Sequence, residues 1–226
     1  MIGQTSILQA VPKQEAKTRK MKTKQRILIT SLALFNELGE PNVTTVDISN
    51  EMEISPGNLY YHYRNKDDII EHIVAMYEQD MAKIIQAEQA LEGLVEHWLF
   101  LKVIVEKNWQ YRFIFRDFEN LVSKYKTIER KLYRLQNKMM QAMLGFIKAL
   151  VSPEINLEHF HHINALADNM AMILTRSPLQ HQEYNSNTET TPSDLLNHTC
   201  FQTLITLWPW MSFENQNILE ELSMNY

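Results

Sequence analysis

A short stretch of the sequence, ISPGNLYYHYRNKD at positions 54–67, places three tyrosines and a histidine between Ser-Pro-Gly and a basic run. Hydroxyl, amide and imidazole groups at this density can hydrogen-bond base edges or phosphates. The alternative is a buried aromatic cluster, but such a cluster does not explain why amide, imidazole and basic side chains alternate with the tyrosines. The stretch is therefore the main candidate for contact with a nucleic acid.

The same stretch predicts a short helix with two different faces. Ser55-Pro56 is a strong helix start, because Ser caps well and the missing N–H of Pro has no helical partner at the first position. Leu59 and Tyr63 are four residues apart, so they share the face that packs inward. Asn58 and His62 share the opposite face, where they can meet the edges of bases in a major groove.

Two further helices are expected before this one. From Thr23 to Leu38 the apolar residues recur at steps of three and four, and Gly39 follows where a helix ends. Thr44 or Thr45 can cap a second short helix that runs through Met52. A three-residue turn then separates that helix from the one that begins at Ser55-Pro56, so the three helices form a compact unit.

The charge is distributed unevenly along the chain. Residues 1–66 hold nine Lys/Arg and six Asp/Glu, a balance of +3, whereas residues 67–226 hold thirteen and twenty-one, a balance of −8. Such a basic segment can bind phosphates without sequence preference, although a solvated basic tail is the plain alternative. The basic residues gather within residues 10–26, at Lys13, Lys17, Arg19, Lys20, Lys22, Lys24 and Arg26.

Composition favours an all-helical protein of the cytoplasm. Five glycines and seven prolines in 226 residues are too few for the many turns of a β-sandwich. A single cysteine, Cys200, excludes an internal disulfide framework, and its apolar neighbours predict a buried thiol. The sequence contains no secretory signal and no run of about 18 apolar residues that would span a membrane.

The rest of the chain is expected to form helices with long apolar faces and one polar loop. The loop is predicted at 177–192, where small and polar residues follow one another. Asp67 or Asp68 is expected to cap the first of these helices. The helices are predicted at about 67–86, 90–107, 109–122, 127–150, 157–175, 193–208 and 213–223.

Residues 23–70 closely resemble the N-terminal DNA-binding domain of the TetR/AcrR family of bacterial transcriptional regulators. The resemblance rests on ILITSLALFNELG, VTTVDISNEMEIS and PGNLYYHYRNKDDII, whose order and turn positions match the family. It implies an all-α fold with a helix-turn-helix at 45–63. It further implies a basic arm at 1–21, a DNA-binding domain at 22–80 and a helical effector-binding and dimerisation domain at 81–226.

Carried over by position, the resemblance implies a set of DNA contacts. Three departures from the family pattern accompany it. Glu53 stands where the family usually has Gly, and a left-handed conformation there would cost roughly 1–2 kcal/mol. Ser49 is small enough for close helix contact, and the loop at 40–42 is one residue longer than is typical. The implied contacts are Thr44, Thr45, Ser55, Pro56, Gly57, Asn58, Tyr60, Tyr61, His62 and Lys66.

Aromatic and methionine side chains between 90 and 175 suit an adaptable pocket for apolar molecules, although ordinary core accounts for each of them as well. Arg112 and Arg116 can hold a ligand carboxylate or phosphate, or else pair internally with a residue such as Asp117. The stretch 109–122 is similar to regulators of polyhydroxyalkanoate metabolism, which implies an acyl-type effector. The candidate pocket residues are Trp98, Trp109, Phe113, Arg112, Arg116, Met139, Met143 and Met170.

No metal or other cofactor is expected. His159, His161 and His162 lie close in sequence, with Glu158 and Asp168 nearby. A metal site needs three or four converging ligands, and no thiolate accompanies these residues. Histidines on a helix surface are the preferred interpretation.

The expected function is sequence-specific transcriptional regulation. The resemblance implies a homodimer, joined through its C-terminal helices, that represses by binding an inverted-repeat operator and is released by a hydrophobic small-molecule effector. An activator, or a chromosome-organising dimer without an effector, would share the same DNA-reading half. An enzyme is disfavoured, because no phosphate-binding glycine loop, nucleophile motif or metal-binding motif occurs in the sequence.

Overall fold

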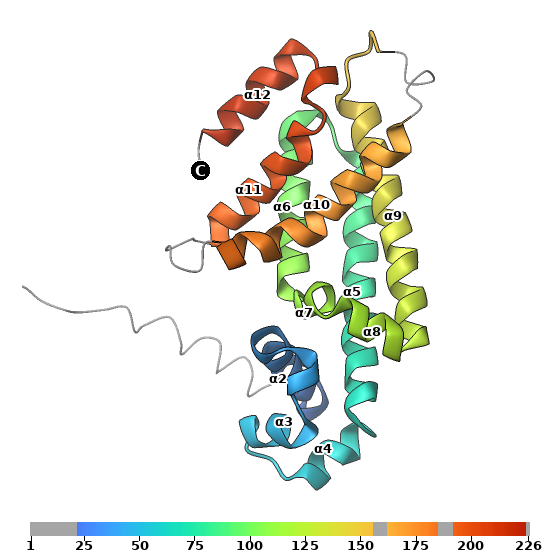
Figure 1. Cartoon of the computed structure of the whole chain (residues 1–226), viewed down its shortest axis with the longest axis vertical. Coiled ribbons are helices and arrows are strands. Elements are labelled where there is room, and N and C mark those ends of the chain that lie inside the picture. Colours follow the sequence, from blue (N-terminus) through green and yellow to red (C-terminus); the bar gives the residue numbers. More distant parts are fainter. Residues whose placement is uncertain (1–21, 156–161, 185–191, 225–226) are drawn as a thin grey trace, which may run out of the picture. The chain divides into compact units, whose positions relative to one another are not determined.

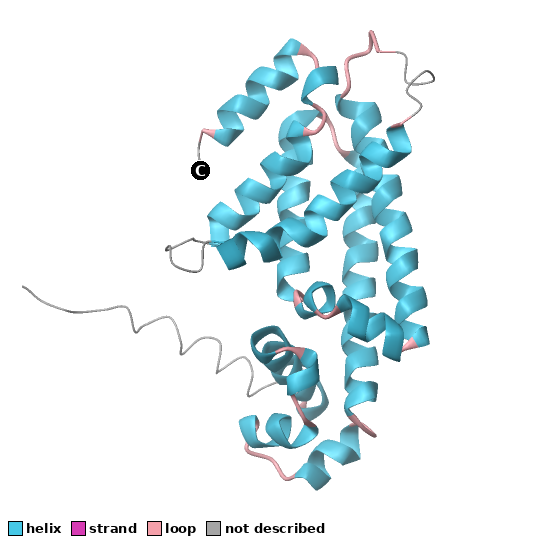
Figure 2. Cartoon of the chain, in the orientation of Figure 1, coloured by secondary structure: helices cyan, strands magenta, loops and turns pink. Residues whose placement is uncertain are grey.

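The computed structural model describes residues 22–155, 162–184 and 192–224 (Figure 1). These residues form helices and no strand, which confirms the predicted all-α class (Figure 2). None of the helices in these ranges is long and apolar enough to cross a membrane. The chain divides into two compact units, Met1–Ile73 and Val74–Tyr226, and each is described by itself.

The first unit packs three helices and the start of a fourth around one apolar core. Its elements are α2 (Thr23–Leu38), the short η1 (Glu40–Asn42), α3 (Thr45–Glu51), α4 (Pro56–His62) and the first residues of α5 (Lys66–Gln86). Each helix contributes the apolar side chains that its periodicity predicted. The fully buried core residues are Ile27, Phe35, Ile48, Leu59, Ile69 and Ile70.

Side-chain caps fix where the short helices of this unit begin. Thr44 caps α3: its Oγ1 accepts the N–H of Asp47 at 3.2 Å, and its own N–H donates to the Asp47 carboxylate at 2.8 Å. Hydrogen bonds from Thr44 hold the pKa of Asp47 below its ordinary value. The prediction that Asp67 or Asp68 caps α5 is wrong, because Oδ1 of Asn65 accepts the N–H of Asp68 at 2.9 Å.

The second unit is a bundle of longer helices. One predicted helix, 109–122, is broken into two short ones, because the chain turns at Tyr111 and again at Asp117. The elements after α5 are η2 (Ala87–Ala90), α6 (Gly93–Gln110), α7 (Phe113–Arg116), α8 (Phe118–Lys124), α9 (Lys126–Leu150), α10 (Ile163–Tyr184), α11 (Pro192–Ile205), η4 (Trp208–Trp210) and α12 (Phe213–Ser223).

Helix α10 continues through Pro178 to Tyr184, so the prediction of a loop from 177 is wrong for 177–184. Of the rest of that predicted loop, 185–191 lies outside the described residues and Pro192 begins a helix. Proline has no N–H to give to the carbonyl of Leu174, four residues earlier. Nδ2 of Asn108 donates to that carbonyl instead, at 2.9 Å, and Oδ1 of Asn108 accepts the hydroxyl of Tyr77 at 2.8 Å. A buried amide on α6 therefore satisfies the carbonyl that Pro178 leaves without its helical donor.

Cys200 lies on α11 and is fully buried, as its apolar neighbours predicted. Burial raises the pKa of its thiol to about 12. The thiolate, which is the reactive form, is therefore scarce at neutral pH.

Replacing Asn108 tests the role of this amide. Asn108→Leu should lower the free energy of unfolding by about 2–5 kcal/mol, because the buried hydroxyl of Tyr77 and the carbonyl of Leu174 both lose a partner. Urea denaturation followed by tryptophan fluorescence measures this, since all four tryptophans belong to the second unit.

Pro178→Ala is the matched control for that substitution. Alone it should not destabilise the protein, because it restores an N–H to the helix. Combined with Asn108→Leu it should recover part of the loss, since the new N–H can donate to Leu174. Equal losses for Asn108→Leu with and without Pro178→Ala would contradict the interpretation.

Candidate nucleic-acid interface and ligand cavity

Helix α4 presents the two faces that the sequence predicts. Leu59 is fully buried and Tyr63, the residue that ends the helix, is 1 % exposed. On the other side Tyr61 is 84 % exposed and Asn58 is also exposed, with His62 half-buried beside them. The polar and aromatic groups therefore point away from the core of their own unit, and the alternative of a buried aromatic cluster holds for Tyr63 but not for Tyr61.

Tyr63 fastens the end of α4 to α2. Its hydroxyl donates to the main-chain oxygen of Lys24 at 3.1 Å, and its ring meets the ring of His72 edge-on, with centroids 5.2 Å apart. Burial raises the pKa of Tyr63 to about 12, so the hydroxyl keeps its proton and remains a donor at neutral pH. This third tyrosine of the motif is a structural anchor.

The turn between α3 and α4 takes the left-handed shape that the family pattern requires, although the residue is not glycine. Glu53 has a φ of 55°, and the next N–H, that of Ile54, donates to the carbonyl of Ser49 at 3.0 Å. Ser49 is buried, and its hydroxyl donates to the carbonyl of Thr45 at 2.8 Å. The small side chain of Ser49 and the left-handed turn at Glu53 together let α3 and α4 cross closely.

A second contact joins α3 to α4 on the outer side. The hydroxyl oxygens of Thr45 and Tyr60 lie 2.9 Å apart and share a hydrogen bond. The rings of Tyr61 and His62 meet edge-on at 5.1 Å. Outside its chain neighbours and the backbone of its own helix, the nearest atom to a Cβ added at Gly57 would be Oγ of Ser55, at 3.9 Å, so there is open space beside Gly57. The polar side chains are thus held in place while remaining on the surface.

The structure gathers the predicted DNA-contact residues at the start of α3 and along α4, with one exception. Lys66 is the first residue of α5, and its ammonium is already paired with Glu40. Of the basic residues between 10 and 26, Lys22 and Lys24 are exposed and Arg26 is half-buried, while the basic arm at 1–21 lies outside the described residues. The exposed members of the set are Thr44, Ser55, Pro56, Gly57, Asn58, Tyr60 and Tyr61.

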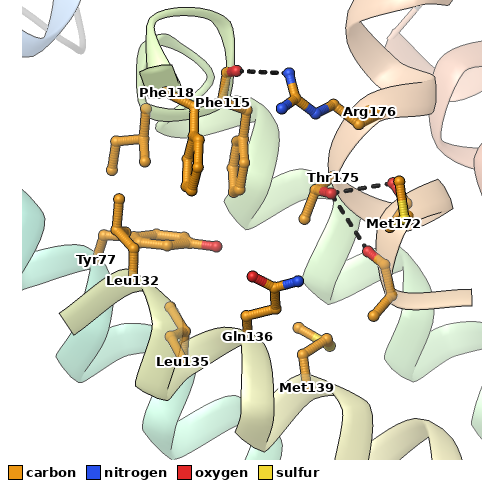
Figure 3. A pocket seen from close by; sticks show the side chains of 12 residues that line it. Tyr77, Phe115, Phe118, Leu132, Leu135, Gln136, Met139, Met172, Thr175 and Arg176 are labelled. Carbon is orange, nitrogen blue, oxygen red and sulfur yellow. Dashed lines mark hydrogen bonds between the residues drawn. The ribbon is translucent and has the colours of Figure 1, made fainter. Parts of the chain in front are cut away.

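The second unit contains a cavity of about 190 Å³ that is lined mainly by apolar side chains (Figure 3). In Figure 3 the Gln136 amide points into the cavity from α9. Arg176 stands at its rim on α10 and donates to the carbonyl of Phe115 at 3.1 Å. The lining residues are Tyr77, Ile114, Phe115, Phe118, Leu132, Leu135, Gln136, Met139, Ala171, Met172, Thr175 and Arg176.

Among the eight predicted pocket residues, all of which the structure describes, Met139 alone lines this cavity. Four others are buried in the core of the second unit: Trp98, Phe113, Met143 and Met170.

The two arginines predicted for the pocket are engaged elsewhere. Arg112 lies over the ring of Trp109 at 4.8 Å, and Arg116 contacts Asp117 at 3.4 Å. The second of these contacts is the internal ion pair that the sequence left open as an alternative.

Two signals for the cavity were present in the sequence. Leu132, Leu135 and Met139 follow one another at helical spacing on α9, and Phe115 and Phe118 stand close together in the aromatic run. Of the α10 residues that line the cavity, only Arg176 lies beyond the helix predicted at 157–175.

The described residues contain no cluster of three side chains that could hold a metal ion. Two of the three candidate histidines, His159 and His161, lie outside the described residues together with Glu158.

Helix α4 is short, follows a tight turn, is anchored by its apolar face and displays hydrogen-bonding groups outward. These features define a helix-turn-helix DNA-binding protein. Comparisons with known proteins identify the family. The family described as bacterial regulatory proteins, tetR family, matches residues 27–73, and the family described as TetR, bacterial transcriptional repressor, matches residues 76–218. The chain belongs to the TetR family of bacterial transcriptional regulators.

Individual relatives agree with this assignment. The transcriptional regulator QacR of Staphylococcus aureus is 28% identical over 126 residues, 54% of this chain and 67% of that protein. IcaR of Staphylococcus epidermidis, a negative regulator of a biofilm operon, is 41% identical over 46 residues, 20% of this chain and 25% of that protein. A TetR-family regulator of Marinobacter aquaeolei has a crystal structure that is 27% identical, with a TM-score of 0.77, and covers 91% of this chain and 99% of its own.

A pair of substitutions tests which side of α4 supports the fold. Leu59→Ala should lower the free energy of unfolding by about 2–5 kcal/mol because it empties a fully buried site. Tyr61→Ala should change it by no more than about 0.5 kcal/mol, because that ring is largely exposed. Circular dichroism during urea denaturation measures both, and similar losses for the two variants would show that the assigned faces are wrong.

Proposed function

We propose that the protein is a homodimeric repressor that binds an inverted-repeat operator and leaves it when a small apolar molecule fills the cavity of the second unit. The DNA-binding part of this proposal rests on the outward face of α4, where Tyr61 and Asn58 are exposed while Leu59 is buried. IcaR, which is described as a negative regulator, favours repression over activation.

The chemistry of the α4 face suits reading of bases in the major groove. The amide of Asn58 can pair with an adenine through two hydrogen bonds, and the ring of Tyr61 can contact a thymine methyl group. The linked hydroxyls of Thr45 and Tyr60 are suited to phosphate oxygens, which position the protein without reading sequence, because the bond between them uses only one of their two hydrogens. Residues of α3 and α4 thus combine positioning and recognition.

A dimer follows from the size of this reading element. One short helix contacts only a few base pairs, and a two-fold dimer doubles the site by placing a second helix about 34 Å away. Helix α12 leaves Phe213 78 % exposed, which is unusual for so large an apolar side chain and favours burial against a second copy. Sedimentation analysis of the protein should therefore find a dimer.

The cavity favours an effector that is mostly apolar and carries one acidic group. Its walls are aromatic and aliphatic, so an alkyl or ring portion gains free energy by leaving water there. At its rim the guanidinium of Arg176 has five N–H donors, of which the bond to Phe115 uses one. A fatty acid or a similar carboxylic acid fits this combination, and the cavity volume of about 190 Å³ limits its size.

Release of the operator requires that the effector prefers one conformation of the protein over another. Helix α5 is the candidate for transmitting this preference, since it runs without interruption from Lys66 to Gln86. Its first residues belong to the first unit, and its Tyr77 lines the cavity of the second. A ligand that moves Tyr77 would act on α5, whose first residues belong to the DNA-reading unit.

Two other functions remain distinguishable by experiment. An activator would use the same DNA contacts, and a chromosome-organising dimer would occupy many dispersed sites without responding to a small molecule. Genomic footprinting distinguishes a chromosome-organising dimer from a regulator, because a regulator should occupy one or a few promoters.

The DNA contacts are tested by removing single polar groups. Asn58→Ala and His62→Ala should each weaken binding to the footprinted operator about tenfold or more, with little effect on a duplex of unrelated sequence. Asn137→Ala, which removes an exposed amide from α9, is the matched control and should bind both duplexes normally. Equal losses on both duplexes for Asn58→Ala would exclude a base-reading role.

The effector site is tested by filling the cavity. Ala171→Leu should abolish the response to medium-chain fatty acids, because Ala171 lines the cavity, and should leave operator affinity unchanged. Ala165→Leu adds the same side chain to the exposed side of α10 and should preserve the response.

Calorimetry with octanoic acid and with octanamide tests the role of Arg176. Arg176→Gln should weaken the binding of the acid and leave the binding of the amide unchanged. Equal weakening of both would contradict the proposed anchor.

A further inference from the structure

The ammonium of Lys66 is held inside the first unit by Glu40. Nζ of Lys66 lies 2.9 Å from the carboxylate oxygen Oε1 of Glu40 and donates to the main-chain oxygen of the same residue at 2.5 Å. It also lies 5.7 Å from the centroid of the Phe35 ring, which is fully buried. One hydrogen bond, one ion pair and one aromatic face therefore hold the ammonium.

The burial of the two partners is unequal, and this decides how the pair behaves. The side chain of Glu40 is 1 % exposed and that of Lys66 is 19 % exposed. A buried carboxylate is costly unless a positive charge accompanies it, so the carboxylate cannot easily release its partner. A phosphate that sought Lys66 would have to compete with an anion that is fixed in place and protected from salt.

The pair also joins the two ends of the helix-turn-helix. Glu40 lies just before α3, and its carbonyl accepts the N–H of Val43 at 3.3 Å, directly ahead of the cap Thr44. Lys66 begins α5, directly after α4. Residues 43–65, which hold both helices and the turn, are thus closed into a loop by one ion pair.

We propose that Glu40 controls whether Lys66 contacts DNA: its carboxylate retains the ammonium as an internal clamp on the helix-turn-helix, so that Lys66 does not neutralise a phosphate. This reverses the role that the family resemblance implied for Lys66, and it rests on the proposed DNA-binding function. Glu40, in the longer first loop, is then a positioning residue for the whole reading element.

The salt dependence of binding to a short duplex of mixed sequence tests this proposal. Each phosphate contact makes the negative slope of log K against log[salt] steeper by about 0.9. Four full-length proteins are compared: wild type, Lys66→Met, Glu40→Gln and the double variant. Lys66→Met should leave the slope of the wild type unchanged. In the Glu40→Gln background, where the ammonium is released, the same substitution should flatten the slope by about 0.9.

An equal effect of Lys66→Met in both backgrounds, whether zero or a loss of about 0.9, would overturn the proposal. Thermal melting of the same four proteins gives a second readout that does not require DNA. Each single variant should lower Tm, and the double variant should lose less than the sum of the two, because the partners act as a pair. Additive losses would also overturn the proposal, whereas failure of wild type to bind any duplex would refute the DNA-binding function alone.

Discussion

Burial of Leu59 in the core of the first unit is the interaction on which the reading surface depends. A helix of seven residues has too few hydrogen bonds to be stable in water without tertiary contacts. Its cap at Ser55 and its anchor at Tyr63 fix both ends, and the buried leucine fixes its rotation. Once that rotation is set, the side chains at the intervening positions have no inward site, and Tyr61 must face the solvent or a partner.

The second unit is organised by a related constraint, the need to satisfy buried polar groups. Pro178 deprives the carbonyl of Leu174 of its helical donor, and Asn108 supplies another. The same amide accepts the hydroxyl of Tyr77, which turns the polar end of that side chain toward the protein and leaves its ring available to the cavity. The apolar character of this part of the cavity is therefore a consequence of how a proline is tolerated in α10.

Charge has different consequences at the two cationic side chains that the structure singles out. Lys66 is largely covered and lies against a carboxylate that is itself buried, so its charge serves the fold. Arg176 is exposed, donates to the neutral carbonyl of Phe115 and lies over the Phe118 ring, and in the proposed function its charge holds the effector. On this proposal, burial and the nature of the first partner, more than the residue type, separate a structural cation from a binding one.

The sequence by itself determined the all-helical class, the helix start at Ser55 and the two faces of α4, and it narrowed the start of α3 to Thr44 or Thr45, because capping and periodicity act between residues close in the chain. It also identified the family through those local features. Tertiary structure alone decided the pairing of Lys66 with Glu40, the continuation of α10 beyond Pro178 and the membership of the cavity. These depend on partners that are distant in sequence, and no local pattern states which buried group a distant side chain will satisfy.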